Sequence, residues 1–155
     1  MPNLYDEIDL CWHWSGDFDV STEGDLLDTS NDTLLSLRQE IHTIMASDLN
    51  DWELYPGYAA TLSDFIGEPN NQNTAAAIHD RIRMALTANG VILESDLRIK
   101  VIPVHRHKVL VTIKVSAIPT AYNRLQQESY VTALVFDYME HSIFFLDKVP
   151  TLIGG

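Results

Sequence analysis

The 155-residue sequence contains a single cysteine, Cys11, so no disulfide can form within the chain. Such sparse use of cysteine suits a reducing compartment, and we expect synthesis in the cytoplasm. No apolar run approaches the ~20 residues that a membrane-spanning helix needs. Residues 1–6 are acidic and have no basic stretch, so we expect neither a secretory signal nor a membrane partner.

Lysine and arginine are absent from residues 1–37, a segment that holds nine carboxylates. Residues 81–124, in contrast, carry a net charge of +6, although the whole chain has a net charge of −12. Because phosphate neutralisation dominates affinity for nucleic acids, a chain this acidic is not expected to bind them. The uneven charges serve either solubility alone or the orientation of the molecule within an assembly, and the sequence leaves both interpretations open.

Apolar residues make up 46% of the sequence, and a chain of this length can bury roughly two-thirds of its unfolded surface. We therefore predict a single domain over residues 1–155. Helical and strand patterns are segregated along the chain, which predicts an α+β fold. Two main helices and a short third pack on an antiparallel sheet. An acidic arm with a hairpin occupies residues 1–30, the core 31–118, and an extra C-terminal hairpin 119–155.

Two segments have the apolar spacing of amphipathic helices. The first follows the N-cap oxygens of residues 30–32, and the second opens after an N-cap at Asn73 or Thr74 and stops at Asn89-Gly90. A short helix is expected near residues 60–66. The predicted buried stripes are Leu34, Leu37, Ile41, Ile44 and Met45 in the first long helix, and Ala75, Ile78, Ile82, Ala85 and Leu86 in the second.

Alternating apolar residues predict two antiparallel hairpins. Residues 97–103 and 109–115 form the first, around residues 105–108, with Pro103 at a strand end or an edge. Residues 130–138 and 142–146 form the second, which either pairs internally or projects outward. In residues 109–115 the odd-numbered valines and isoleucine are expected to pack on the helices, and an exposed edge is expected to recruit a strand from a partner.

Candidate catalytic and metal-binding groups do not form a convincing constellation. His105 and His107 would share a strand face, but no cysteine or carboxylate stands near them, and Arg106 and Lys108 would repel a cation. Cys11 and His13 point to opposite faces of an extended segment. No glycine-rich phosphate loop is present. We predict a protein without a cofactor, a metal or a catalytic activity.

Carboxylates and aromatics leave alternatives open. A small glycan (peptidoglycan) hydrolase needs only two carboxylates across a cleft, and residues 48–53 offer candidates. A soluble chaperone or immunity-type binder with an acidic face is a third possibility. The aromatic residues of predicted irregular segments are core residues or interface anchors, and they are Trp12, Trp14, Trp52, Tyr55 and Tyr58. The carboxylates considered for catalysis are Asp6, Glu7, Asp9, Asp48, Asp51 and Glu53.

The order of these motifs resembles the small baseplate wedge proteins of contractile-tailed bacteriophages, a lysozyme-like family with relatives in type VI secretion baseplates. The order and spacing of the motifs carry the resemblance, which covers residues 15–118, about two-thirds of the chain. The matching segments are residues 17–20, 23–25, 34–45, 54–58, 62–67, 78–86, 101–104 and 109–115.

The resemblance implies a virion protein that links the baseplate wedge to the first ring of the tail sheath. Its partners would be the sheath protein, other wedge subunits and central hub or tube proteins. Strand pairing with the sheath would involve Leu97, Ile99, Val101, Val109, Val111, Ile113 and Val115. Wedge docking would involve Glu94, Trp52, Tyr55 and Tyr58. Many members carry a Glu-Pro-Arg motif, of which residues 89–96 retain Glu94 alone.

Overall fold

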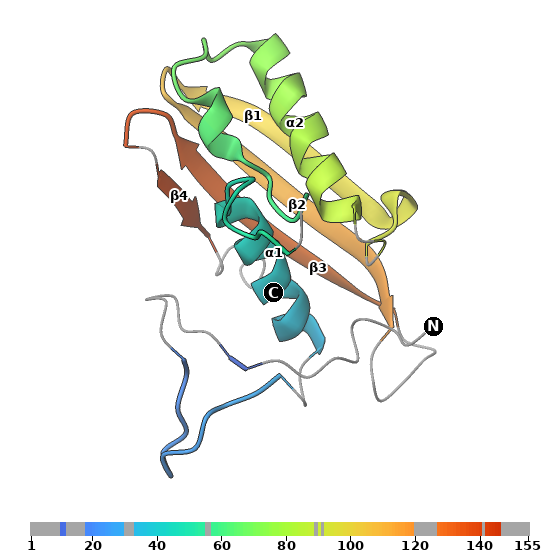
Figure 1. Cartoon of the computed structure of the whole chain (residues 1–155). Helices are drawn as coiled ribbons and strands as arrows, with labels where there is room; N and C mark the ends of the chain where they lie inside the picture. Colours follow the sequence, from blue (N-terminus) through green and yellow to red (C-terminus); the bar gives the residue numbers. More distant parts are fainter. Residues whose placement is uncertain are drawn as a thin grey trace.

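The computed structural model describes residues 10–11, 18–29, 33–54, 57–88, 90, 92–119, 127–140 and 142–146. Two helices and a four-stranded antiparallel sheet confirm the predicted α+β class, and the helices lie on one face of the sheet (Figure 1). The helical elements are α1 (Thr33–Ala46), the 3-10 turn η2 (Leu62–Phe65), α2 (Gln72–Thr87) and the 3-10 turn η3 (Glu94–Asp96). The strands are β1 (Leu97–His105), β2 (Lys108–Pro119), β3 (Gln127–Asp137) and β4 (Ser142–Phe145).

The sheet has the strand order β1-β2-β3-β4, with every neighbouring pair antiparallel. The predicted β1–β2 hairpin is confirmed, and its connection is the two-residue turn Arg106-His107. Pro103 lies on β1, an edge strand, as its missing N–H requires. The C-terminal hairpin pairs internally, because β3 runs along β2 and β4 along β3.

The core lies between the helices and the inner face of the sheet. The predicted stripe of α2 is confirmed, since all five of its residues are buried. Leu37, Ile41, Ile44 and Met45 of α1 are also buried. They meet Val109, Val111, Ile113 and Val115 of β2, which are 0–1% exposed. Burying side chains of this size stabilises the fold by roughly 1.5–3 kcal/mol each.

The N-cap of α2 lies two or three residues before the predicted position. The Oδ1 atom of Asn71 accepts a hydrogen bond of 3.0 Å from the N–H of Thr74, so Asn71 is the cap and the prediction of Asn73 or Thr74 is wrong. The Thr74 hydroxyl instead donates to the carbonyl of Pro69 at 2.7 Å. Asn70 donates to the carbonyls of His105 and Lys108, which ties the start of α2 to the β1–β2 turn.

The expected exposed edge along residues 109–115 is not an edge of the sheet. Strand β2 pairs with β1 on one side and with β3 on the other, so both rows of its backbone groups lie inside the sheet. The physical reason is that the C-terminal hairpin adds two strands beyond β2. The two edges of this sheet are β1 and the four-residue β4.

Residues 18–28, here called the arm, extend away from the body of the molecule (Figure 1). Antiparallel bridges join Val20 to Leu26 and Leu10 to Asp28. The base of the arm is attached to α1, because the side chain of Gln39 donates to the carbonyl of Leu10 at 3.1 Å. Between these two bridges, the N–H of Cys11 donates to the carbonyl of Leu27, and the carbonyl of Cys11 accepts from the N–H of Asp19, both at 2.9 Å.

Several sequence predictions fall outside the described residues. They concern the carboxylates Asp6, Glu7 and Asp9, the aromatic residues Trp12, Trp14 and Tyr55, and His13. Among the residues that the structure describes, no helix is both long enough and apolar enough to cross a membrane.

Replacing the α2 cap tests the revised helix start. Asn71→Ala removes the acceptor for the Thr74 N–H, and we expect the free energy of unfolding to fall by about 0.5–2 kcal/mol in urea titrations. Asn71→Asp is the matched control, because it keeps an oxygen at the same place and should retain most of the stability. Equal stability of the alanine variant and the parent would contradict this cap.

Candidate interaction surfaces

The orientation of backbone groups at the β1 edge follows from two hydrogen bonds near the ends of the sheet. The N–H of Tyr138 donates to His107 at 2.8 Å, and the N–H of Leu146 donates to Ala133 at 2.7 Å. In an antiparallel ladder such hydrogen-bonded pairs recur at every second residue. Up to Val115, the odd-numbered residues of β2 therefore bond to β3, and the even-numbered residues that face β1 bond to it.

The same alternation decides which groups of β1 point outward. Arg98, Lys100 and Ile102 face the even-numbered residues of β2 and bond to it. The N–H and C=O groups of Leu97, Ile99 and Val101 therefore point away from the sheet. Among the described residues, no hydrogen bond outside this ladder involves Ile99 or Val101. An extended partner chain would find donors and acceptors at these two positions.

The N-terminal end of this edge is closed by Arg98, a residue that sequence reasoning did not single out. Its Nη1 atom donates to the carbonyl of Leu97 at 3.0 Å and to that of Ser95 at 3.2 Å. Pro103 has no N–H to offer at the other end. The open part of the edge is therefore short and centred on Ile99 and Val101.

The seven residues predicted to pair with a sheath strand lie on two neighbouring strands, with their side chains toward the helices. Leu97 is buried and Ile99 and Val101 are partly buried against the core. The other four residues, Val109, Val111, Ile113 and Val115, are buried on β2. Only backbone groups can carry the pairing, and those of β1 alone face outward.

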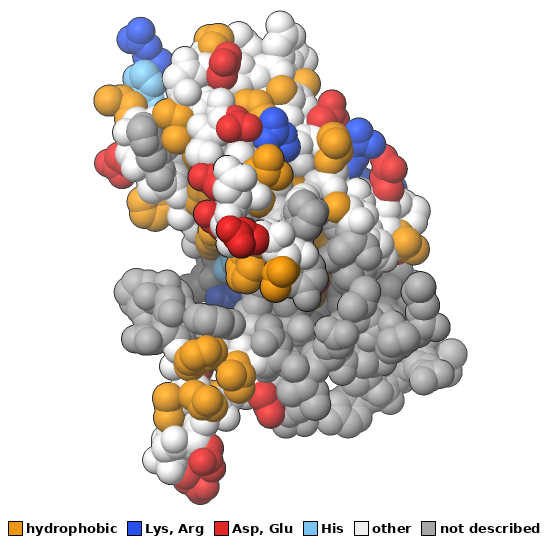
Figure 2. All heavy atoms as spheres, viewed as in Figure 1, with side chains coloured by type: hydrophobic (Ala, Val, Ile, Leu, Met, Phe, Trp, Pro, Cys, Tyr) orange, Lys and Arg blue, Asp and Glu red, His pale blue; other side chains and the backbone are white. Residues whose placement is uncertain are grey.

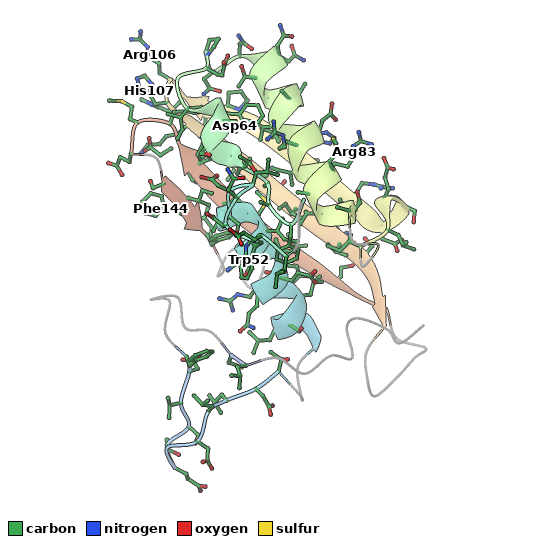
Figure 3. The ribbon with its side chains drawn as sticks, viewed as in Figure 1. Trp52, Asp64, Arg83, Arg106, His107 and Phe144 are labelled. Atoms are coloured by element: carbon green, nitrogen blue, oxygen red, sulfur yellow. The ribbon has the colours of Figure 1, made fainter. Side chains whose placement is uncertain are left out.

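Two of the predicted docking aromatics, Trp52 and Tyr58, lie in the loop after α1. Trp52 is 41% exposed, and its indole N–H donates to the Ser47 hydroxyl at 2.9 Å. Its ring meets Tyr58 edge-on at 5.8 Å between centroids, and Tyr58 packs against the core. The exposed Leu49 and Leu54 belong to the same loop. In Figure 3 Trp52 and Asp64 lie on the helical side of the molecule.

Glu94, the fourth predicted docking residue, comes later in the chain than these aromatics and lies at the start of η3. Its Oε1 atom is 2.5 Å from Nη1 of Arg83 on α2, and Asp80 lies 3.7 Å from the same guanidinium. The hydrogen bond and the charge of Glu94 raise the pKa of Arg83. Glu94 thus has an intramolecular partner, so docking through its carboxylate would compete with Arg83.

Two of the carboxylates considered for catalysis, Asp48 and Asp51, have local structural partners, and so does the nearby Asp64. Asp48 accepts a hydrogen bond of 2.6 Å from the Ser63 hydroxyl, and Asp51 accepts one of 2.8 Å from the N–H of Asp48. Asp64 pairs with Arg81 at 3.0 Å. The rings of His105 and His107 lie 6.3 Å apart. Within the described ranges, no group of three or more His, Cys, Asp or Glu side chains could hold a metal ion.

A buried carboxylate closes the β3–β4 turn. Asp137 is buried, lies 3.3 Å from Nζ of Lys108 and accepts hydrogen bonds from the N–H groups of Met139 and Glu140 at 2.9 and 3.3 Å. Burial by itself raises the pKa of Asp137, but these two N–H groups and Lys108 together lower it below the usual value. Sequence reasoning missed this contact, because it joins β2 to β3.

Comparison with known proteins does not extend these observations. No protein-family model, no curated protein and no solved structure matches the chain.

Amide hydrogen exchange of the isolated protein tests which N–H groups of β1 point away from the sheet. The N–H groups of Ile99 and Val101 should exchange faster than those of Lys100 and Ile102, which donate to β2. We expect a difference of roughly a hundredfold or more, because an opening free energy of about 3 kcal/mol slows exchange by that factor. The exchange is measured by NMR. Equal protection of all four amides would mean that another chain segment pairs with this edge, or that different residues of β1 bond to β2.

Acid titration tests the role of Asp137. Because its pKa is lowered in the folded state, the carboxylate contributes stability above its unfolded pKa and loses that contribution as the pH falls through the folded value. The urea midpoint of the parent should therefore exceed that of Asp137→Asn at neutral pH, and the two should converge below about pH 4. The variant Glu140→Gln, which changes an exposed carboxylate of the same turn, is the control. A difference that is independent of pH would contradict this assignment.

Proposed function

We propose that this chain is a non-catalytic component of a contractile phage tail baseplate, where it links the wedge to the first sheath ring and initiates sheath assembly by strand addition. The single observation that carries the proposal is the β1 edge, where the outward N–H and C=O groups of Ile99 and Val101 have no hydrogen-bond partner among the described residues. A sheath strand added here would extend the sheet beyond β1.

The position of the edge supports a joint that holds under load. Strand β1 is paired to the buried β2 over eight residue pairs, and α2 packs on its inner face. A strand added to β1 therefore joins a ladder that continues through β2 to β3. The affinity of such a joint comes from backbone hydrogen bonds, which tolerate changes in the partner's side chains.

Other residues and elements of the chain would have roles in the same baseplate function. Trp52 and Tyr58 would anchor the neighbouring wedge subunits, with Glu94 and Tyr55 as further docking residues. In this proposal the arm would be the expected N-terminal hairpin, and η2 would be the short third helix. The protein would act in the virion after synthesis in the host cytoplasm.

Proline substitution at the outward edge tests strand addition. Val101→Pro removes an N–H that points away from the sheet, so the β1–β2 ladder keeps its bonds and the fold should survive. Purified tails that incorporate this variant should lack sheath, as seen by electron microscopy. The matched control is Val101→Ala, which loses the same side-chain packing but keeps the N–H group.

Two outcomes separate the parts of this proposal. Normal sheaths on tails that contain folded Val101→Pro would reject strand addition at β1. Absence of the protein from purified tail particles, measured by mass spectrometry, would reject the baseplate function as a whole. Cross-links from Lys100 to the sheath protein would locate the joint.

A further inference from the structure

The outer face of the sheet carries an apolar row that crosses all four strands. Ile102 of β1 lies opposite Leu110 of β2, Leu110 lies opposite Val135 of β3, and Val135 lies opposite Phe144 of β4. Ile102 is 45% exposed and Phe144 is 53% exposed, with the two inner residues half-buried between them. Cross-strand neighbours of this kind touch, so the four side chains form one continuous surface.

The described helices leave this surface open. They pack on the opposite face, where the odd-numbered residues of β2 belong to the core. Figure 3 labels Phe144 on β4, the strand at one end of the row. An apolar row across a whole sheet is typical of a binding surface rather than of a solvated face.

Basic residues border the row on one side. Arg98 and Lys114 are cross-strand neighbours, and Lys100 lies on the same face between Arg98 and Ile102. All three are exposed, and within the described part of the chain none of them forms an ion pair. The outer face therefore combines an apolar row with an uncompensated positive border. A fitting occupant is apolar and acidic.

The arm has that chemistry. Phe18, Val20, Leu26 and Leu27 are exposed along it, with Val20 and Leu26, its bridged pair, 55% and 52% exposed. Residues 18–28 also hold four carboxylates, Asp19, Glu23, Asp25 and Asp28, and no lysine or arginine. Figure 2 shows the apolar side chains gathered on the arm and acidic ones toward its tip.

We infer that the arm of one copy of this chain docks on the outer sheet face of a second copy. Val20 and Leu26 would cover the row around Leu110 and Val135, while the arm carboxylates would face Arg98, Lys100 and Lys114. The arm is attached at its base to α1, on the helical side of the sheet, and projects away from the body (Figure 1), so it reaches another copy rather than its own outer face. This inference does not depend on the proposed baseplate function.

The contact is head-to-tail, because the arm and the outer face are different surfaces. Each copy keeps one free arm and one free face after a first contact, so rings or open chains can grow. The opposite charges of the two surfaces make the association sensitive to salt, since ionic strength screens exposed charges.

Sedimentation equilibrium of the full chain tests the contact. The mass should rise above the 17.5 kDa of one chain as the concentration increases to about 1 mM, where even a millimolar contact is half-formed, and it should fall when salt is added. A single species of 17.5 kDa throughout this range would overturn the inference and leave the outer face to a different acidic partner.

Two variants address the two surfaces separately. Lys114→Glu in the outer face and the arm variant Val20→Asn with Leu26→Asn should each weaken self-association by at least about tenfold, because each removes one side of the contact. Arg106→Glu, in the exposed β1–β2 turn, alters the net charge by the same amount as Lys114→Glu and should leave self-association unchanged. Loss of association in all variants alike, including Arg106→Glu, would mean that net charge and not this contact decides it.

A mixing experiment separates a head-to-tail contact from other geometries. The arm variant keeps an intact outer face and the Lys114→Glu variant keeps an intact arm, so an equimolar mixture should form a one-to-one complex although neither variant associates alone. No complex in the mixture, or undiminished self-association of the arm variant through a face-to-face contact, would overturn the inference.

Discussion

The position of β2 between β1 and β3 is the constraint on which the rest of the structure depends. Its odd-numbered side chains from Val109 to Val115 are 0–1% exposed and form the surface on which α1 and α2 pack. Its backbone groups are divided between two ladders, one to each neighbouring strand. A strand fixed in this way by packing and by pairing cannot leave the sheet without opening the core. Its backbone groups are therefore not available to a partner strand, and only its outward side chains, such as Leu110 and Lys114, remain for contact.

Those elements divide the molecule into surfaces of different chemistry. The β1 edge offers backbone donors and acceptors but little side-chain specificity, since its odd-numbered side chains face the helices. The outer face offers an apolar row with a basic border, and the arm offers apolar side chains among carboxylates. The uneven distribution of charge along the chain thus has a spatial counterpart. The acidic N-terminal segment supplies the arm, and the basic segment supplies β1 and the outer face.

Sequence patterns predicted the local elements well where one periodicity extended over many residues. The stripe from Ala75 to Leu86 placed α2 because helical spacing is a property of the segment itself. The cap at Asn71 was missed, since several polar residues in a row can each serve as the N-cap, each accepting from a different N–H, and only the geometry of the turn selects one. The outer row was missed for a different reason. Leu110 alternates with buried valines and so lies on the face away from the helices, but Val135 and Phe144, which continue the row across β3 and β4, come from a distant part of the sequence.

The sequence by itself determined the helices and the two hairpins, because each follows from contacts between residues close in the chain. It also determined the segregation of charge, which is a property of the order of the residues. It also limited Pro103 to a strand end or an edge, because proline cannot donate to a ladder. Only the tertiary structure decided which strand has a free edge and which face of the sheet stays open. Both depend on the pairing of β3 with β2, a contact between separate hairpins. Alternation along a strand tells which residues share a face, but a neighbour from elsewhere in the chain decides whether that strand or that face meets solvent, protein or a partner.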